Sequence, residues 1–323
     1  MRAVHIVAPG QLEIVEVPAP VPGPNQALLR PRLIALCGSD VRVCYYAPRE
    51  DYPWAIGRNG HEIIARIEAI NGDPRGLRVG DLVLALVPGE AGMAEAFTTD
   101  LDNLLPLPPG PPLEHLLMAQ QLGTVIYACK RLPNLIGKDA VVIGQGSAGL
   151  FFDALLRRLG LERVIALDNR DARLEAARRF GASHVVHTER EDALAAVSAV
   201  TSGALADLVV EAAGEPETIN LAPHLVKPYG WICSFGVPRG PHVFPFDYYT
   251  LFRKRCHWFS SDGTVGEPGR ASIRQALGMI ARGETDVSGL VTHRFPFERV
   301  REAYELARTR DDGAIKIVVE IAE

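Results

Sequence analysis

Two short motifs in the first part of the chain carry side chains that are able to bind a metal ion. One is Cys37-Gly38-Ser39-Asp40 and the other is Gly60-His61-Glu62. A cysteine thiolate and a neutral imidazole are natural zinc ligands, and a catalytic zinc site needs a third ligand and one open position. Spacing alone is a weak signal, because a buried cysteine also behaves as a small hydrophobe. From the residues alone, a zinc site and ordinary packing both remain open.

A glycine-rich segment near the middle of the chain has the form of a dinucleotide-binding turn. The segment reads Val141-Val142-Ile143-Gly144-Gln145-Gly146-Ser147-Ala148-Gly149, an apolar strand followed by the start of a helix. Gly144 permits a tight turn, Gly146 lets the backbone approach the pyrophosphate, and Gly149 allows close packing of helix on strand. The phosphates are expected at the helix N-terminus, at Ser147 and Ala148, where free N–H groups and the helix dipole favour anions.

An acidic residue follows the next predicted strand. This strand, Arg163 to Leu167, ends at Asp168, which lies 19 residues after Gly149, close to the spacing of about 20 for a ribose-binding acid. Its carboxylate is able to accept hydrogen bonds from both ribose hydroxyls. It also repels a 2′-phosphate, by about 4 kcal/mol per unit charge at about 4 Å and an effective dielectric constant of about 20. NAD is therefore favoured over NADP.

Nearby arginines and a simpler alternative both bear on the prediction of NAD binding. Arg170 and Arg173 lie near Asp168 in the sequence and would soften the repulsion of a phosphate; we assign Arg173 to the cofactor site. The alternative is a plain strand–helix turn, with Asp168 capping the next helix.

The predicted secondary structure that positions these residues changes in character between the two parts of the chain. The first hundred residues are rich in strand signals and in Pro and Gly, with strands expected at Leu12–Val17, Ala27–Ile34 and Glu62–Ile70. From Asp139 the pattern alternates between strands and helices, which indicates a parallel sheet covered on both faces. The chain after residue 264 is expected to return to the first domain. The predicted division is 1–121 with 265–323, and 122–264.

Composition excludes several classes of protein. The chain has 323 residues, 47% hydrophobic and 23% charged, with a net charge of −5, typical of a globular protein with two domains. Basic residues are scattered, so a nucleic-acid partner is not indicated. We find no signal peptide and no apolar run of membrane-spanning length. Five widely spaced cysteines without a Cys-x-x-Cys pair favour a reduced, cytoplasmic location.

Taken together, the motifs resemble the medium-chain dehydrogenase/reductase family, in its zinc-dependent alcohol and polyol dehydrogenase branch. The resemblance covers nearly the whole chain and rests on Pro22-Gly23-Pro24, Cys37-Gly38-Ser39-Asp40, Gly60-His61-Glu62, Gly80-Asp81-Leu82-Val83, the glycine turn and Asp168. It implies an α/β protein with a GroES-like, β-rich catalytic domain and a doubly wound Rossmann domain, with the active site in the cleft between them.

The resemblance also implies roles for individual residues. Cys37 and His61 would be ligands of one catalytic zinc ion. Ser39 would relay the proton of the substrate hydroxyl. Asp40 would support His61, and Glu62 would lie beside the metal.

The sequence departs from the family pattern at two places. The stretch from Val87 to Glu95 has no cysteine, so the lobe that binds a structural zinc in many members is expected to be absent. Polyol-type relatives place a ligating Glu, followed by Pro, where this chain has Gln120 and Gln121. Zinc held by a thiolate, a neutral imidazole and the Gln120 amide would carry a charge of about +1. Such a site would retain metal more weakly, unless Glu62 compensates.

The predicted activity is NAD(H)-dependent interconversion of a secondary alcohol, such as a polyol or a sugar-like compound, and a ketone. Zinc would act as the Lewis acid, and hydride would pass to the nicotinamide. One alternative is a zinc-free reductase of the same family that acts on an activated double bond or an imine. The other is an NAD(H)-binding sensor without turnover. Apolar strands near Gly230–Phe235 and Cys256–Ser260 suggest a sheet edge, and self-association as a homodimer or homotetramer.

Overall fold

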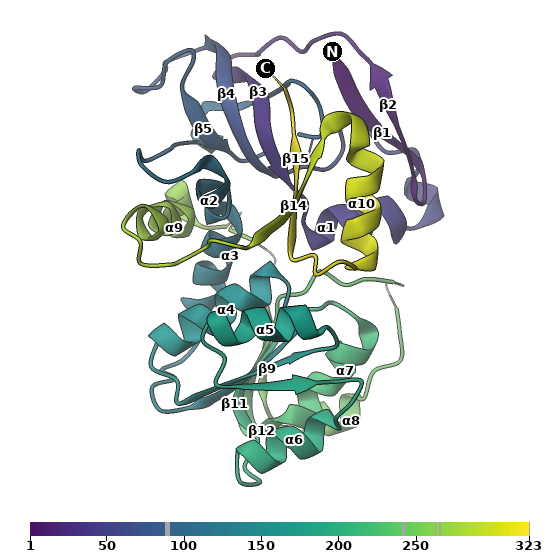
Figure 1. Cartoon of the computed structure of the whole chain (residues 1–323), viewed down its shortest axis with the longest axis vertical. Helices are drawn as coiled ribbons and strands as arrows, with labels where there is room; N and C mark the ends of the chain where they lie inside the picture. Colours follow the sequence, from purple (N-terminus) through teal and green to yellow (C-terminus); the bar gives the residue numbers. More distant parts are fainter. Residues whose placement is uncertain (88–90, 241–242, 262, 265, 323) are drawn as a thin grey trace. The chain divides into compact units, whose positions relative to one another are not determined.

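The computed structural model of the chain describes residues 1–87, 91–240, 243–261, 263–264 and 266–322 (Figure 1). These residues form two compact units. The terminal unit comprises Met1–Gln120 and Pro268–Glu323, and the central unit comprises Gln121–Glu267. The sequence places the corresponding boundaries at 121/122 and 264/265. Residues 88–90, within the stretch where the structural zinc lobe is expected to be absent, lie outside the described residues.

The central unit is built on a six-stranded sheet in which all neighbouring strands are parallel. Its strand order is β10-β9-β8-β11-β12-β13, which is the 3-2-1-4-5-6 order of a doubly wound dinucleotide-binding fold. The strands are β8 (Asp139–Ile143), β9 (Arg163–Asp168), β10 (His184–His187), β11 (Ala206–Glu211), β12 (Val226–Ser234) and β13 (His257–Ser260). After β10 the chain crosses to the other side of β8, where β11 pairs with it. The ends of β8 and β11 therefore form the switch point where such folds bind ligands.

Helices cover both faces of this sheet, as the alternating pattern predicts. They are α4 (Ser147–Arg158), α5 (Asp171–Arg179), α6 (Ala193–Val200), α7 (Pro216–Leu225) and α8 (Tyr248–Lys254). In Figure 1, α4 and α5 lie on one face of the sheet; α4 packs on β8 and β9, and α5 packs on β9 and β10. The strands read as nearly continuous apolar runs because both faces are covered; every residue of β8 and β11 is buried.

One buried residue of α4 makes the stability of the central unit depend on pH. Asp153 is completely buried, and neither of its carboxylate oxygens has a hydrogen-bond partner within the described part of the chain. Burial raises the pKa of this carboxyl well above its usual range. The folded protein therefore keeps a proton that the unfolded chain releases, so the contribution of Asp153 to stability falls as the pH rises above about 4.

We expect an Asp153→Asn variant to gain stability relative to the unmodified protein as the pH rises from 4.5 to 7. The gain should be about 1.4 kcal/mol for each pH unit over which Asp153 keeps its proton. Denaturant unfolding of both proteins at several pH values measures this difference, and the shared titrations of other carboxyls cancel. A difference that is the same at every pH would show that Asp153 ionises normally in the folded protein.

The terminal unit contains a seven-stranded sheet with the path β14-β15-β3-β4-β5-β7, and β6 pairs with β3. Its strands are β3 (Gln26–Ala35), β4 (Glu62–Asn71), β5 (Leu82–Ala85), β6 (Phe97–Asp100), β7 (Leu104–Pro106), β14 (Val291–Pro296) and β15 (Lys316–Glu320). A separate hairpin joins β1 (Arg2–Ala8) to β2 (Gln11–Glu16). Because β15 pairs with β3, the end of the chain does return to the first domain.

The described part of the terminal unit also contains the helices α1 (Gly38–Tyr45), α2 (Leu113–Leu117), α9 (Ala271–Ala281) and α10 (Val300–Thr309). Helix α3 (Ala119–Cys129) begins at the boundary of this unit. The apolar stretch that begins at Leu113 folds as two helices, α2 and α3, which meet at Met118. Helix α10 packs its apolar side, including Val300, Ala303 and Tyr304, into the core of this unit.

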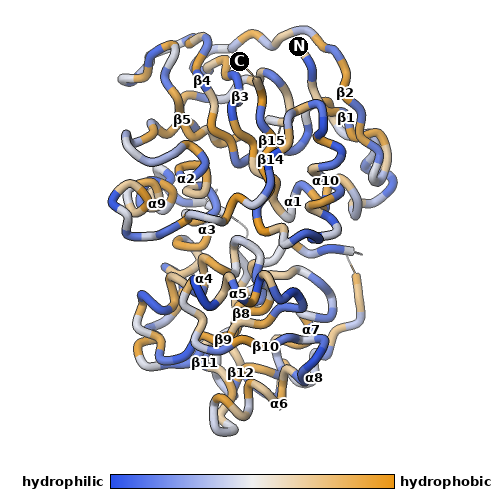
Figure 2. Tube along the Cα trace, viewed as in Figure 1, coloured by the Kyte–Doolittle hydropathy of each residue, from blue (hydrophilic) through white to orange (hydrophobic). Residues whose placement is uncertain are grey.

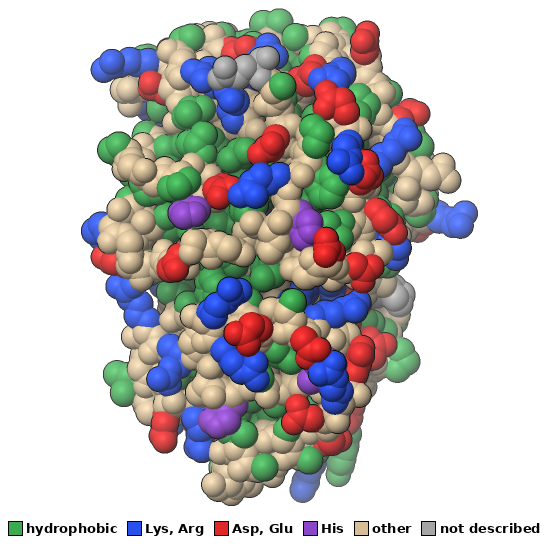
Figure 3. Space-filling view, in the orientation of Figure 1, with side chains coloured by type: hydrophobic (Ala, Val, Ile, Leu, Met, Phe, Trp, Pro, Cys, Tyr) green, Lys and Arg blue, Asp and Glu red, His purple; other side chains and the backbone are tan. Residues whose placement is uncertain are grey.

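Hydrophobic residues concentrate along the sheet strands of each unit (Figure 2). On the face shown in Figure 3, lysine and arginine side chains alternate with aspartate and glutamate rather than gathering by sign. Among the described residues, no helix has both the length and the apolar character needed to cross a membrane.

Candidate metal centre and dinucleotide turn

Strand pairing brings the two candidate metal-binding motifs together in the terminal unit. Strands β3 and β4 are antiparallel, and Ala35 near the end of β3 is opposite Glu62 at the start of β4. Cys37 follows the end of β3, and His61 precedes the start of β4. Both residues therefore lie at the same end of one strand pair, although 24 positions separate them in the sequence.

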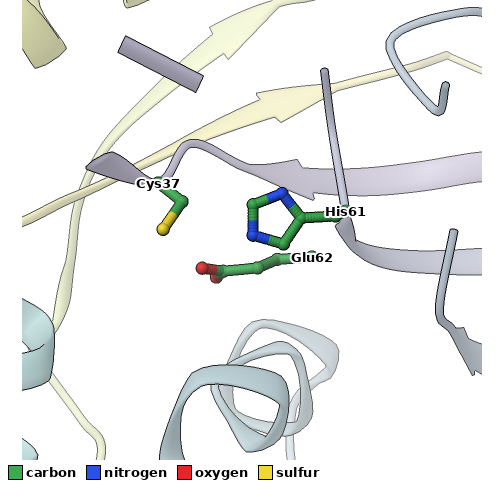
Figure 4. A group of neighbouring side chains, drawn as sticks. All are labelled: Cys37, His61 and Glu62. Atoms are coloured by element: carbon green, nitrogen blue, oxygen red, sulfur yellow. The ribbon is translucent and has the colours of Figure 1, made fainter. Parts of the chain in front are cut away.

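The side chains of Cys37, His61 and Glu62 converge (Figure 4). Their candidate ligand atoms lie within 4.8 Å of one another. In the figure, the sulfur, one ring nitrogen and the carboxylate point toward a common space. Zinc binds sulfur at about 2.3 Å and nitrogen or oxygen at about 2.0–2.2 Å. This set of donors and their separation therefore fit one divalent zinc ion.

Asp40 connects the two turns that carry Cys37 and His61. It is completely buried. Its carboxylate accepts hydrogen bonds from the main-chain N–H of Cys37 (2.7 Å) and from the main-chain N–H of Gly60 (3.0 Å). The first of these bonds also closes the N-terminal turn of α1. Oδ1 of Asp40 lies 3.8 Å from Nδ1 of His61, too far for a hydrogen bond.

The surroundings of His61 favour a positive charge. Burial opposes a charged imidazole, but the hydrogen bond to Cys37 and the negative charge of Asp40 outweigh it, and the pKa of His61 rises to about 10. A proton on this ring and a bound metal ion would both balance the negative charge of the surrounding acidic groups. Metal ligands must be deprotonated, so a bound metal ion would displace this proton.

Glu62 is held by a lysine that sequence reasoning did not identify. Nζ of Lys316, the first residue of β15, lies 2.7 Å from Oε1 and 2.6 Å from Oε2 of Glu62. Both side chains are fully buried. Burial works against charge on the lysine, but the negative charge of Glu62 prevails and raises the pKa of Lys316 above its ordinary value. Lys316 therefore balances the charge of Glu62 and competes with a metal ion for its carboxylate oxygens.

This pair supports a prediction about stability. Replacing Lys316 by methionine leaves the Glu62 carboxylate buried without its cation, which should cost about 3–5 kcal/mol of unfolding free energy. Adding Glu62→Gln should recover much of this loss, because the uncompensated charge is gone. Denaturant unfolding of metal-free protein measures the four members of this cycle. Single-variant losses that simply add in the double variant would contradict the assigned pairing.

Ser39 and Gln120 differ in how far the structure places them. Ser39 lies in the first turn of α1, beside Cys37, and its hydroxyl is buried with no hydrogen-bond partner in the described part of the chain. A buried hydroxyl without a partner is costly, so this group suits a ligand that supplies one. Gln120 lies in the first turn of α3 with a half-buried side chain. Its approach to the metal centre stays a prediction.

The glycine turn of the central unit has the local geometry that the motif predicts. Gly144 has φ +91°, a conformation that favours glycine, and an added Cβ would meet Ala213 at 2.9 Å. A Cβ on Gly149 would lie 2.0 Å from the main-chain oxygen of Gly144. A Cβ on Gly146, by contrast, would meet nothing within 4 Å. Gly146 therefore faces open space next to the N-terminus of α4, where a pyrophosphate would approach the backbone.

Asp168 ends β9 beside this turn. Its side chain accepts hydrogen bonds from the main-chain N–H of Gln145 (2.6 Å) and of Arg170 (3.0 Å). An ionised carboxylate has about four acceptor sites, so about two are left for ribose hydroxyls. Ser147 is buried and Ala148 half-buried at the start of α4, and Arg173 lies in α5 with its side chain largely buried.

Sequence reasoning missed three residues that are linked to the candidate metal centre by hydrogen bonds: Lys316, Asn59 and Tyr304. For Lys316 a signal was present, since it is a charged residue at the start of an otherwise apolar strand. Asn59 and Tyr304 carried no such signal. Their hydrogen bond (2.9 Å) joins positions 245 residues apart.

Comparisons with known proteins agree with this geometry. Residues 23–109 match the family model of the alcohol dehydrogenase GroES-like domain, and residues 148–282 match that of the zinc-binding dehydrogenase. The chain is 28% identical over 366 aligned residues to an alcohol dehydrogenase of Cupriavidus necator, covering 99% of this chain and 98% of that protein. It is 26% identical over 335 residues to an L-threonine 3-dehydrogenase of Bacillus subtilis, with 94% of each chain covered.

Solved structures show the same likeness. An alcohol dehydrogenase from Thermus sp. ATN1 superimposes with a TM-score of 0.83 at 26% identity, covering all of both chains. A galactitol-1-phosphate dehydrogenase from Escherichia coli has the same fold, with a TM-score of 0.83 at 20% identity, over 99% of this chain and 100% of that one. The fold is thus a GroES-like domain with a Rossmann-type domain, and the chain is an oxidoreductase that belongs to the zinc-type medium-chain dehydrogenase/reductase family.

Proposed function

We propose that this protein is an NAD(H)-dependent dehydrogenase that interconverts a secondary alcohol and a ketone at one catalytic zinc site. The observation that carries the proposal is the convergence of Cys37, His61 and Glu62. The hydroxyl of Ser39, two residues after Cys37, is buried without a hydrogen-bond partner among the described residues. A sensor without turnover has no need of metal-binding side chains together with a group that moves protons.

Within this proposal each residue of the centre has a task. Cys37 and His61 hold the ion, which when bound supplies a Lewis acid that polarises the substrate oxygen. Ser39 Oγ accepts the hydrogen bond of the substrate hydroxyl and passes its proton toward water. Asp40 fixes the Cys37 and Gly60 main chain through two hydrogen bonds, so that the two ligands stay at a fixed separation.

The third protein ligand is proposed to be Gln120. Glu62 belongs to the converging group, but Nζ of Lys316 lies 2.7 Å from one of its carboxylate oxygens and 2.6 Å from the other. The pair is close to neutral and leaves Glu62 beside the ion rather than on it. An amide ligand has no charge, so the ion keeps more of its own charge and is the stronger Lewis acid for it.

NAD is the proposed coenzyme. It would bind with its pyrophosphate at Gly146, Ser147 and Ala148, and with its adenosine ribose on Asp168. The support is the open space over Gly146 and the acceptor sites left on Asp168. Arg173 is proposed to contribute to the same site. When bound, the nicotinamide supplies the hydride acceptor.

The substrate class rests on the kinds of compound that the relatives are named for. These are alcohols, L-threonine at its third carbon and galactitol 1-phosphate; the last two are compounds with secondary hydroxyl groups. We therefore propose a secondary alcohol of the polyol, sugar or hydroxy-amino-acid type.

Self-association is proposed through the central unit. β13 is the outer strand of its parallel sheet, and an outer strand offers unpaired main-chain groups to a second copy. A homodimer or homotetramer is the expected assembly.

The proposed activity is tested with purified protein, a panel of secondary alcohols and NAD or NADP, together with metal analysis of the same sample. The expected result is about one zinc ion per chain and NAD reduction with at least one polyol or hydroxy acid derivative. Activity on enones or imines in protein that contains no metal would replace the proposal with a zinc-free reductase. Tight NAD(H) binding without turnover of any substrate would replace it with a sensor.

A further inference from the structure

Asn59, two residues before His61, forms hydrogen bonds through both its main chain and its buried side-chain amide. Its side chain is completely buried, and its φ of +85° is one that few residues other than glycine adopt. The main-chain oxygen accepts hydrogen bonds from the N–H groups of Gly92 and Met93, each at 2.9 Å. The side-chain nitrogen donates to the main-chain oxygen of Asp40 (3.0 Å) and to the Tyr304 hydroxyl (2.9 Å).

These contacts close a ring of hydrogen bonds around the ligand turns. The Asp40 carboxylate holds the Cys37 and Gly60 N–H groups, and the Asn59 amide holds the main-chain oxygen of Asp40. The first turn of α1, which is capped by Cys37, is thereby tied to the turn that presents His61. Neither Asn59 nor Tyr304 belongs to the group whose atoms converge at the metal centre.

Tyr304 brings the C-terminal helix α10 into this ring. Its side chain is completely buried in the core of the terminal unit. A phenylalanine would fill the same space without a hydroxyl to satisfy, and burying a hydroxyl is costly unless it forms a hydrogen bond. The bond between Tyr304 and Asn59 offsets this cost and orients the amide toward Asp40.

We propose that Asn59 and Tyr304 are positioning residues of the metal centre, which through Asp40 hold Cys37 and His61 at the separation that one zinc ion requires. The inference rests on the proposed zinc site. Residues that orient the metal ligands through hydrogen bonds typically contribute 10- to 100-fold to metal affinity. Loss of the Tyr304 hydroxyl should therefore affect the metal before it affects the fold.

The test compares Tyr304→Phe with Tyr52→Phe. Tyr52 packs against the same core, and its hydroxyl donates to the main-chain oxygen of Val43 (2.7 Å), so the control also removes one hydroxyl and one hydrogen bond. Asn59→Gly is the second test variant, because glycine accepts the positive φ and lacks the amide. For each protein, zinc transfer to a chromogenic chelator is timed well below the unfolding temperature.

Two further readouts separate positioning from general destabilisation. The visible spectrum of the Co²⁺-substituted protein reports the geometry of the ligands. Hydrogen exchange of the Cys37 and Gly60 amides, followed in metal-free protein, reports the stability of their hydrogen bonds to the Asp40 carboxylate. We expect Tyr304→Phe and Asn59→Gly to release zinc about tenfold faster, to change the cobalt spectrum and to exchange these two amides faster. Tyr52→Phe should match the unmodified protein in all three.

Zinc release and amide exchange unchanged in both test variants would overturn the inference and leave the zinc site intact. An equal effect of Tyr52→Phe would overturn it as well, since any lost hydroxyl would then suffice. If the unmodified protein binds no zinc, the proposed function fails, and the exchange of the two amides alone decides whether Asn59 and Tyr304 position the turns.

Discussion

A Cys37→Ser variant is expected to lose its zinc and nearly all of its dehydrogenase activity. Cys37 is the one thiol among the three side chains whose ligand atoms converge, and a serine hydroxyl does not ionise to replace it. A bound metal ion contributes several kcal/mol of transition-state stabilisation, so kcat/KM should fall on the order of a thousandfold. Metal analysis and steady-state kinetics on the same sample measure both effects.

Cys256→Ser is the matched control. Cys256 lies in the central unit with a partly buried side chain, and its replacement should leave metal content and activity unchanged. Full activity in the Cys37 variant would remove this residue from the mechanism. If the Cys37→Ser variant lost activity but kept its zinc, Cys37 would not be a zinc ligand.

The second large effect is expected at Asp168. Replacing it by asparagine removes the negative charge but keeps an oxygen that is able to accept the Gln145 N–H, so the turn should persist. One unit of charge costs about 4 kcal/mol at about 4 Å and an effective dielectric constant of about 20, and partial access to water reduces this. The preference for NAD over NADP, as a ratio of kcat/KM values, should therefore fall on the order of a hundredfold.

Asp171→Asn controls for charge that lies nearby without touching the ribose site. Asp171 begins α5, is exposed and pairs with Arg190, so its loss should change the coenzyme ratio little. An unmodified protein that already prefers NADP would show that Asp168 does not select the coenzyme. An equal shift of the NAD/NADP ratio in the two variants would show that the ratio depends on the overall negative charge and not on Asp168 itself.

The strand, glycine turn and helix at residues 139–158 could be predicted from the sequence because their determinants are local. Strand, turn and helix follow one another within Asp139–Arg158, and each glycine has a reason that acts within a few residues or at the neighbouring strand end. The two candidate metal-binding motifs were also recognisable one by one. Their meeting was not derivable from spacing, because it depends on the register that sets Ala35 opposite Glu62.

What the sequence did not predict is how the C-terminal part of the chain supports this centre. Lys316 and Tyr304 reach Glu62 and Asn59 only because β15 pairs with β3 and α10 packs on the same core. The short helix α1 was also missed, although it begins directly after Cys37 and places Ser39 in its first turn. Such contacts join residues about 250 positions apart, where no local pattern exists.

The measurement that tests the account most directly is diffraction from crystals grown with NAD, recorded above and below the zinc absorption edge. The account predicts a single zinc peak at bonding distance from Cys37 Sγ and a His61 ring nitrogen, with the Gln120 amide oxygen as a third protein ligand and Glu62 still paired with Lys316. It also predicts NAD with its ribose on Asp168. A structure with NAD bound but no zinc at Cys37 and His61 would contradict the central claim.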